Sequence, residues 1–246
     1  MTKYFSLSLF MKPFFALFRR ELRQFWNSPI AYIFAVAFVV LSFWLFFRLF
    51  FLVGQTEMRG FFDILPQIFL LFLPALTMRL FSEEYRQGTI ETLLTSSIPI
   101  SQAVLAKFCA SLLFLVVTLA ATFALPITLS FFGNLDWGQV ISSYFGAFLL
   151  GSSYISLGLL LSILTSNQIV AFLITALSAF LLLIIGSDIV IFSLPSFLVP
   201  TFQFLSLSTH YSSMTRGVID TRDLLYFLSF IALFLYSSML MLKKKQ

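Results

Sequence analysis

The chain has 246 residues, of which 60% are hydrophobic and only 10% charged, a composition outside that of soluble globular domains. Its net charge of +5 is no argument for nucleic-acid binding, and its single cysteine, Cys109, excludes a disulfide framework and a thiolate metal site. We therefore expect an integral membrane protein without a nucleic-acid partner, and its long apolar runs, which show no β-barrel alternation, predict an all-α fold.

The first predicted element is an amphipathic helix over residues 13–27. Its phenylalanine and leucine residues recur at helical spacing, whereas Arg19, Arg20 and Arg23 share the opposite side. A helix with this pattern lies in the membrane interface, where its arginines meet the phosphates of anionic lipids. The sequence therefore predicts an N-terminal interfacial helix at the membrane surface.

Six apolar runs follow, each long enough to cross about 30 Å of hydrocarbon as a helix. They cover residues 29–53, 61–81, 104–132, 140–164, 169–192 and 224–242. Because unpaired backbone groups are not tolerated in lipid, these runs predict six transmembrane helices. In the fourth run the small residues share one helix face, namely Ala147, Gly151, Gly158 and Ser162. Such a face favours close packing inside the bundle over a dedicated dimer contact.

A polar segment, residues 82–100, separates the second run from the third. It carries the charged residues Glu83, Glu84, Arg86 and Glu91. Since burying unpaired charge in lipid is costly, this segment is predicted to lie in water at a membrane face.

Two short helices are expected inside the 82–100 segment. Ser82 and Thr89 are predicted to cap them, and Gly88 to end the first. The second places its apolar residues on one face and its acid on another, as seen from Ile90, Leu93, Leu94 and Glu91. A short helix of this kind offers a docking edge for a second protein. The alternative is an ordinary solvated loop.

Basic residues cluster on one side of the predicted topology. They precede the first run, flank the 82–100 segment and close the chain, as Lys3, Lys12, Arg19, Arg20, Arg23, Arg79, Arg86, Lys107, Lys243, Lys244 and Lys245. By the positive-inside rule, both termini and the 82–100 segment face the cytoplasm.

Residues 193–223 form the longest connection on the opposite, external side. This stretch is apolar but interrupted by Pro195 and Pro200, which predicts short re-entrant or interfacial helices. Asp223 is expected to cap the last transmembrane helix, and His210 to lie at the surface. Arg216, Asp220 and Arg222 are expected to pair with one another or with lipid head groups.

Two stretches resemble ABC-2 type transporter permeases. In the 82–100 segment the resemblance rests on Glu84, Gly88, Thr89, Glu91, Leu93, Leu94 and Thr95, followed by Lys107. In the external loop it rests on Arg216-Gly217-Val218-Ile219-Asp220 and Arg222-Asp223, which look like the gliding-motility-associated branch. One departure is visible, because the family often has proline where this chain has Ser97, whereas the proline here is Pro99.

The resemblance implies a single ABC-2 type transmembrane domain over residues 1–246, in the bacterial cytoplasmic (inner) membrane. It implies that the 82–100 segment is a cytoplasmic coupling helix seated in a separate ATP-binding subunit. The residues expected to couple are Glu83, Glu84, Gly88, Thr89, Glu91 and Leu94. ATP and Mg²⁺ would be bound by that partner, and a second permease copy or a paralogue would complete a dimer. Export is the expected activity.

The chain is not expected to be an enzyme. No glycine is followed by lysine, so the phosphate-binding GxxxxGK loop is absent, and the single histidine lacks hydrolase partners. Asp63 and Asp188 lack the glycine framing of intramembrane aspartyl enzymes. The alternative function is a non-transporting membrane anchor or regulatory subunit of an ATPase-driven cell-surface machine.

Overall fold

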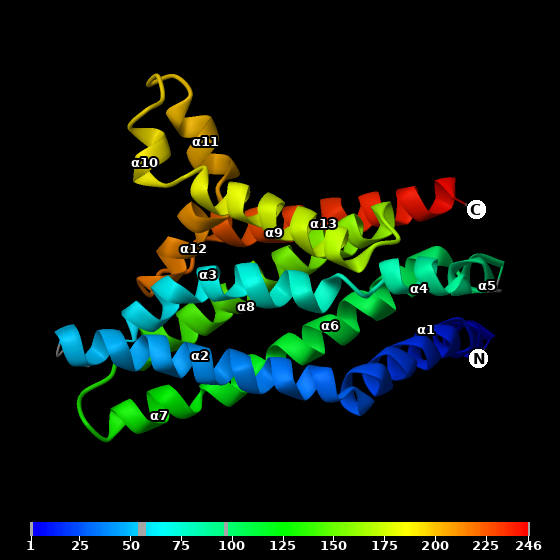
Figure 1. Ribbon diagram of the computed structural model, residues 1–246, viewed down its shortest axis with the longest axis horizontal. Helices are drawn as coiled ribbons and strands as arrows, with labels where there is room; N and C mark the ends of the chain where they lie inside the picture. The colour runs from blue at the N-terminus through cyan, green and yellow to red at the C-terminus, as the bar shows by residue number, and fades with distance from the viewer. Residues whose placement is uncertain (1, 54–57, 96–97, 246) are drawn as a thin grey trace.

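Long helices running in roughly the same direction make up most of the protein (Figure 1). The computed structural model describes residues 2–53, 58–95 and 98–245, and every regular element within these ranges is a helix. The helices are α1 Thr2–Asn27, α2 Pro29–Val53, α3 Arg59–Thr77, α4 Ser82–Gln87, α5 Thr89–Thr95, α6 Ile100–Thr122, α7 Ala124–Ser130, α8 Trp137–Leu164, α9 Gln168–Ile184, α10 Asp188–Ile191, α11 Val199–Leu205, α12 Leu207–Thr215 and α13 Thr221–Lys244.

Within the described ranges, five helical stretches are long and apolar enough to cross a membrane. They are Pro29–Arg48, Arg59–Gln87, Ile100–Ser130, Trp137–Leu164 and Thr221–Lys244. These stretches overlap five of the six predicted runs, because an apolar segment satisfies its backbone groups internally only as a helix. The architecture is therefore that of an all-α, multi-pass membrane protein.

The sixth predicted run, residues 169–192, is not one continuous helix. Helix α9 has 17 residues, about 25 Å at the usual rise, and ends at Ile184. The chain then turns at Gly186, where an added Cβ atom would lie 2.3 Å from the Ser206 hydroxyl oxygen. This close approach of the start of α12 breaks the helix, and α10 begins separately at Asp188. The predicted end of this run at residue 192 was wrong.

The third predicted run is also divided, at Phe123 between α6 and α7. Pro126 has no N–H group to offer Thr122, and a proline ring crowds the carbonyl group four residues earlier. The Phe123 N–H group bonds instead to the Ala120 carbonyl oxygen at 3.1 Å, which tightens the turn. The two helices together still form one membrane-length stretch.

Helix α8 is the centre of the bundle, and its small residues are buried inside the chain. An added Cβ at Gly151 would lie 2.6 Å from Leu115 of α6, and one at Gly158 would lie 2.1 Å from Thr77 of α3. Ala147 and Ser162 are buried as well. The small face therefore lets α3 and α6 approach α8 closely, which confirms packing within the bundle.

Helix α1 begins at Thr2 rather than at Pro13, so the 13–27 boundary was too short at its N-terminal side and Pro13 lies inside the helix. Its apolar side packs against α6, where Leu17 is buried with Ala103 and Ala106. The apolar stripe is thus partly covered by protein, whereas Phe15 and Trp26 remain exposed.

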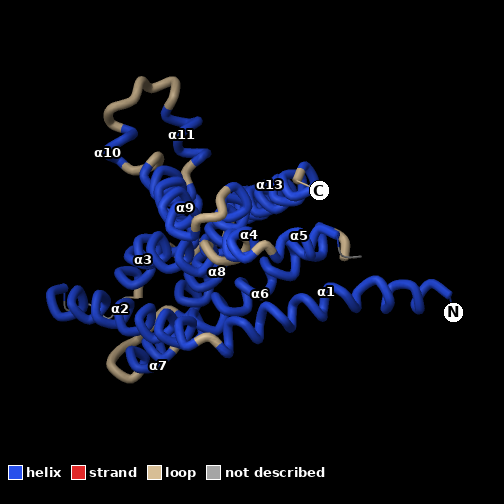
Figure 2. The backbone as a smooth tube through the Cα atoms, turned by 45° about the vertical axis from the view of Figure 1, so that its right-hand side comes forward, coloured by secondary structure: helices blue, strands red, loops and turns tan. Residues whose placement is uncertain are grey.

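The two ends of the bundle differ in what they contain (Figures 1 and 2). Both chain termini lie at the same end as α4 and α5, whereas α7, α10, α11 and α12 lie at the other. Short helices do occupy the 193–223 region, and α10 and α11 form a hairpin that projects away from the long helices. The grouping of the termini with the 82–100 segment agrees with the predicted topology, whose sidedness stays a prediction.

Candidate functional site

Helices α4 and α5 form a sharp elbow at the end of α3. Gly88 adopts φ 71°, a left-handed conformation that glycine adopts at little cost, and its N–H group bonds to the Tyr85 carbonyl oxygen at 3.2 Å. The predicted division of the 82–100 segment at Gly88 is therefore confirmed. The predicted Ser82 cap was wrong, because its hydroxyl donates to the Met78 carbonyl oxygen. The Thr89 hydroxyl donates to the Glu84 carbonyl oxygen at 3.4 Å.

The elbow has an exposed edge and an inward face. The exposed edge consists of Arg86, Gln87, Gly88, Thr89, Glu91, Thr92 and Thr95. Glu84 and Ile90 point inward and are buried, and Glu83 is half-buried. The side chain of Leu94 lies outside the described residues. The predicted coupling residues thus divide between two faces that meet different surroundings.

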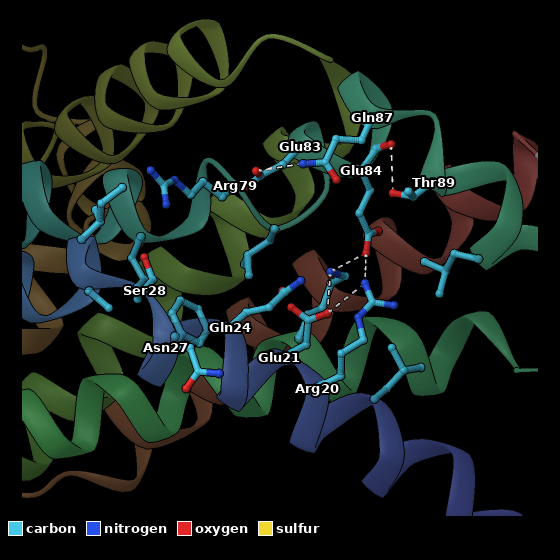
Figure 3. A pocket seen from close by; sticks show the side chains of 18 of the residues that line it. Arg20, Glu21, Gln24, Asn27, Ser28, Arg79, Glu83, Glu84, Gln87 and Thr89 are labelled. Atoms are coloured by element: carbon cyan, nitrogen blue, oxygen red, sulfur yellow. Dashed lines mark hydrogen bonds and ion pairs between the residues drawn. The ribbon is translucent and has the colours of Figure 1, made fainter.

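The inward face contributes to a buried ion cluster that joins three helices (Figure 3). Lys107 of α6 places its Nζ atom 3.0 Å from Oε1 of Glu21 in α1 and 3.0 Å from Oε1 of Glu84 in α4. The Lys107 and Glu21 side chains are only 2% and 3% exposed, and the Glu84 side chain is 10% exposed. We call Arg20, Glu21, Glu84 and Lys107 the ion cluster.

Arg20 closes the ion cluster from the solvent side. Its Nη2 atom lies 2.9 Å from Glu84 Oε1 and 3.8 Å from Glu21 Oε1. The prediction that Arg20 faces lipid like its neighbours was therefore incomplete, because this arginine reaches back to α4. Arg19 and Arg23 are exposed and remain available to lipid phosphates.

The charges of the ion cluster balance, because two cations face two carboxylates. Taking one ion out of water costs several kcal/mol, so a buried group of this kind requires each charge to be compensated. The Phe81 ring adds a cation–π contact, 5.1 Å from Lys107 Nζ to its centroid. Removing one of the three buried members, Glu21, Glu84 or Lys107, would leave buried charge uncompensated.

Sequence reasoning missed Glu21, although a signal for it was present. Glu21 falls four residues after Leu17 and four before Phe25, so it interrupts an apolar helix face with a single acid. An acid at such a position requires a cation from another element. Which cation supplies it depends on the packing of α1 against α6.

The C-terminal end of α13 also contacts the elbow. Lys245 donates from Nζ to the Ile163 carbonyl oxygen at 2.7 Å, and the same atom lies 4.3 Å from the centroid of the Tyr85 ring. Tyr85 belongs to α4 and Ile163 to the last turn of α8. One lysine therefore links the ends of α8 and α13 to the elbow.

A cleft of about 840 Å³ lies beside the ion cluster (Figure 3). Its walls come from α1, the start of α2, the end of α3 and the elbow. Its lining includes polar side chains such as Gln24, Asn27 and Arg79 and apolar side chains such as Phe34 and Leu76.

A second polar cluster lies at the opposite end of the bundle, between α11, α12 and α13. His210 places Nδ1 2.6 Å from Asp223 Oδ1 and Nε2 3.0 Å from the Phe204 carbonyl oxygen. Ser213 also donates to the Asp223 carboxylate, and the imidazole stacks on Tyr226 with 3.9 Å between ring centroids. The prediction of His210 as a surface residue was wrong, because its side chain is only 11% exposed.

The first turn of α13 is capped by Asp220, not by Asp223 as predicted. The Asp220 carboxylate accepts from the Arg222 N–H group at 2.9 Å, while Asp223 is turned toward His210. Arg216 donates from Nε to the Ser212 carbonyl oxygen at 3.2 Å. Among the described residues, Arg216, Asp220 and Arg222 form no ion pair with one another.

Helix α12 is held to the bundle by Tyr211. Its hydroxyl donates to the Phe62 carbonyl oxygen at 3.0 Å. Burial raises the pKa of Tyr211 well above its usual value, with smaller contributions from Asp63 and two neighbouring tyrosines, so the hydroxyl keeps its proton. Within the described part of the chain, no group of three or more His, Cys, Asp or Glu side chains is placed to hold a metal ion.

Comparison with protein-family models and with curated proteins finds no match to this chain. The fold and the site together define an all-helical protein with membrane-length helices, a charged elbow at one end and a buried ion cluster behind it.

Proposed function

We propose that this chain is the transmembrane permease subunit of an ABC-2 type transporter, in which the α4–α5 elbow binds a separate ATP-binding subunit. One observation carries the proposal. The elbow presents an exposed polar edge at the end of the bundle that holds both termini, while its inward face is bonded to the long helices through Glu84.

This arrangement suits the transmission of movement. Glu84 connects α4 to α6 through Lys107 and to α1 through Arg20, and Tyr85 contacts the Lys245 ammonium at the end of α13. A displacement of the elbow by a partner therefore acts on several long helices at once. Packed helix bundles respond to such a force by shifting between discrete arrangements rather than by bending.

In the proposed assembly, two permease chains act with two ATP-binding subunits in the bacterial cytoplasmic membrane, with both termini in the cytoplasm. Helix α9 serves as the sixth transmembrane helix, because a short apolar helix is accommodated by local thinning of the bilayer. ATP and Mg²⁺ are bound by the partner subunit. This chain provides the path along which the substrate is exported.

The test is a comparison of two charge reversals at opposite ends of the bundle. The tagged full chain is purified in mild detergent with its ATPase partner, and both partner retention and ATP hydrolysis are measured. We expect Glu91→Arg, on the exposed edge, to reduce both at least about tenfold, as loss of a charge-assisted contact would. Asp188→Arg, exposed at the other end, should leave both unchanged.

Equal retention of the ATPase by the two variants would overturn the coupling role of the elbow.

A transport assay in sealed vesicles distinguishes the two functions considered from the sequence, the permease and the anchoring or regulatory subunit. If the wild-type complex hydrolyses ATP but none of the lipid, polysaccharide or drug probes moves, the anchoring or regulatory function replaces the permease.

A further inference from the structure

We propose that the cleft between α1, α2, α3 and the elbow binds a phospholipid whose head group carries a phosphate and a primary ammonium, as phosphatidylethanolamine does. The inference does not depend on the proposed transporter function. It rests on two charged residues of the cleft, Arg79 and Glu83, that form no ion pair with any described residue, and on the apolar surface of α2 that continues from the cleft.

Within the part of the chain that the structure describes, the lining of the cleft includes one cation and one anion that form no ion pair. The charges of the ion cluster neutralise one another, as described above. Arg79 is half-buried and forms neither an ion pair nor a hydrogen bond with any residue in the described ranges. Among the described residues, Glu83 accepts only from the Gln87 side-chain amide, at 3.1 Å. Figure 3 shows the Arg79 side chain pointing away from the ion cluster, and Arg79 is one of the residues that line the cleft.

Arg79 and Glu83 favour a ligand with both signs of charge. A guanidinium group binds a phosphate through paired, charge-assisted hydrogen bonds, and a carboxylate accepts from an ammonium group. A ligand carrying only a negative charge would also meet the Glu83 carboxylate. A zwitterionic head group satisfies both residues and leaves the cleft neutral.

The apolar wall indicates a lipid rather than a soluble phosphate. Ile30 and Phe34 of α2 line the cleft, and Ile30 is 39% exposed. The exposed face of α2 continues from it through Ile33 and Val36, which are 65% and 63% exposed. Acyl chains can therefore lie along α2 while the head group occupies the cleft at the bend between α1 and α2.

The test measures lipid retention by the purified full chain with native mass spectrometry. The probes are phosphatidylethanolamine, phosphatidylglycerol and the soluble head group glycerophosphoethanolamine. We expect the wild-type chain to retain phosphatidylethanolamine over phosphatidylglycerol. Arg79→Gln should lower that retention about tenfold, the effect of losing a charge-assisted hydrogen bond. The control is Arg86→Gln, exposed on the same segment and outside the cleft, which should retain lipid like the wild type.

Glu83→Gln tests the ammonium half of the site, and should abolish the preference between the two lipids while keeping binding. Arg79→Lys keeps the cation but loses the paired hydrogen bonds of the guanidinium, so it should retain less phosphatidylethanolamine than the wild type, and it serves as the test if Arg79→Gln fails to fold. Equal retention of both lipids by the wild type would overturn the inference, as would equal losses in Arg79→Gln and Arg86→Gln. Retention of glycerophosphoethanolamine equal to that of phosphatidylethanolamine would overturn the lipid assignment and identify the ligand as a small soluble phosphate.

Discussion

The Nζ atom of Lys107 lies 3.0 Å from Oε1 of Glu84, and this buried contact fixes the orientation of the elbow. Glu84 belongs to the segment whose sequence predicts a docking edge, yet its carboxylate faces the protein. The exposed edge of the elbow is therefore formed by other residues of the same segment, such as Glu91. Contact with a partner and connection to the bundle are made by different residues only a few positions apart.

The ion cluster predicts a large effect of removing its central cation. Lys107→Met leaves Glu21 and Glu84 buried without their shared ammonium, which we expect to destabilise the protein by about 3–5 kcal/mol. Thermal unfolding in detergent measures the loss, with exposed Arg23→Gln as the control that changes little. Adding Glu21→Gln and Glu84→Gln should recover part of the stability. A Lys107→Met protein as stable as the control would show that the cluster is not held by charge.

Glu84 and Glu91 should respond differently to the same substitution. Glu84→Gln weakens bonds to Lys107 and Arg20, so the stability should fall by about 1.5–3 kcal/mol. Glu91→Gln changes an exposed carboxylate and should alter stability by less than about 0.5 kcal/mol. Denaturation monitored by tryptophan fluorescence compares the two. Similar losses would mean that both acids serve the same structural purpose.

Because α8 packs closely on α3, we expect that adding a methyl group at Gly158 lowers the stability of the protein. In Gly158→Ala the new Cβ would lie 2.1 Å from Thr77 Oγ1, so α3 must shift, at a cost of about 1–3 kcal/mol. Gly60→Ala is the matched control, because nothing lies within 4 Å of its added Cβ. The midpoints of thermal unfolding distinguish the variants. Equal midpoints would indicate that α3 and α8 separate easily.

The His210 cluster should anchor the α10–α11 hairpin. His210→Phe keeps a ring against Tyr226 but removes both imidazole hydrogen bonds, including the one to the Phe204 carbonyl oxygen. We expect faster amide hydrogen exchange over the hairpin, residues 188–205, and unchanged exchange in α8. Ser212→Ala, an exposed neighbour, is the control. Unaltered exchange in the hairpin would exclude this anchoring role.

The candidate site was only partly predictable from the sequence. The elbow and its division at Gly88 follow from local rules, because charges must avoid lipid and glycine adopts positive φ at little cost. The pairing of Lys107 with Glu21 does not follow from any local pattern, since the two residues are 86 positions apart. Helix capping was also decided by neighbours, because Asp223 is drawn away from the helix end by His210.

The sequence by itself determined that this is a helical protein of membrane-length segments. An apolar run of about 20 residues satisfies its backbone in lipid only as a helix, whatever its neighbours are. Only the tertiary structure decided that α9 ends at Ile184 and that Glu84 faces inward. Both depend on contacts between helices far apart in the chain, which hydrophobic periodicity does not encode.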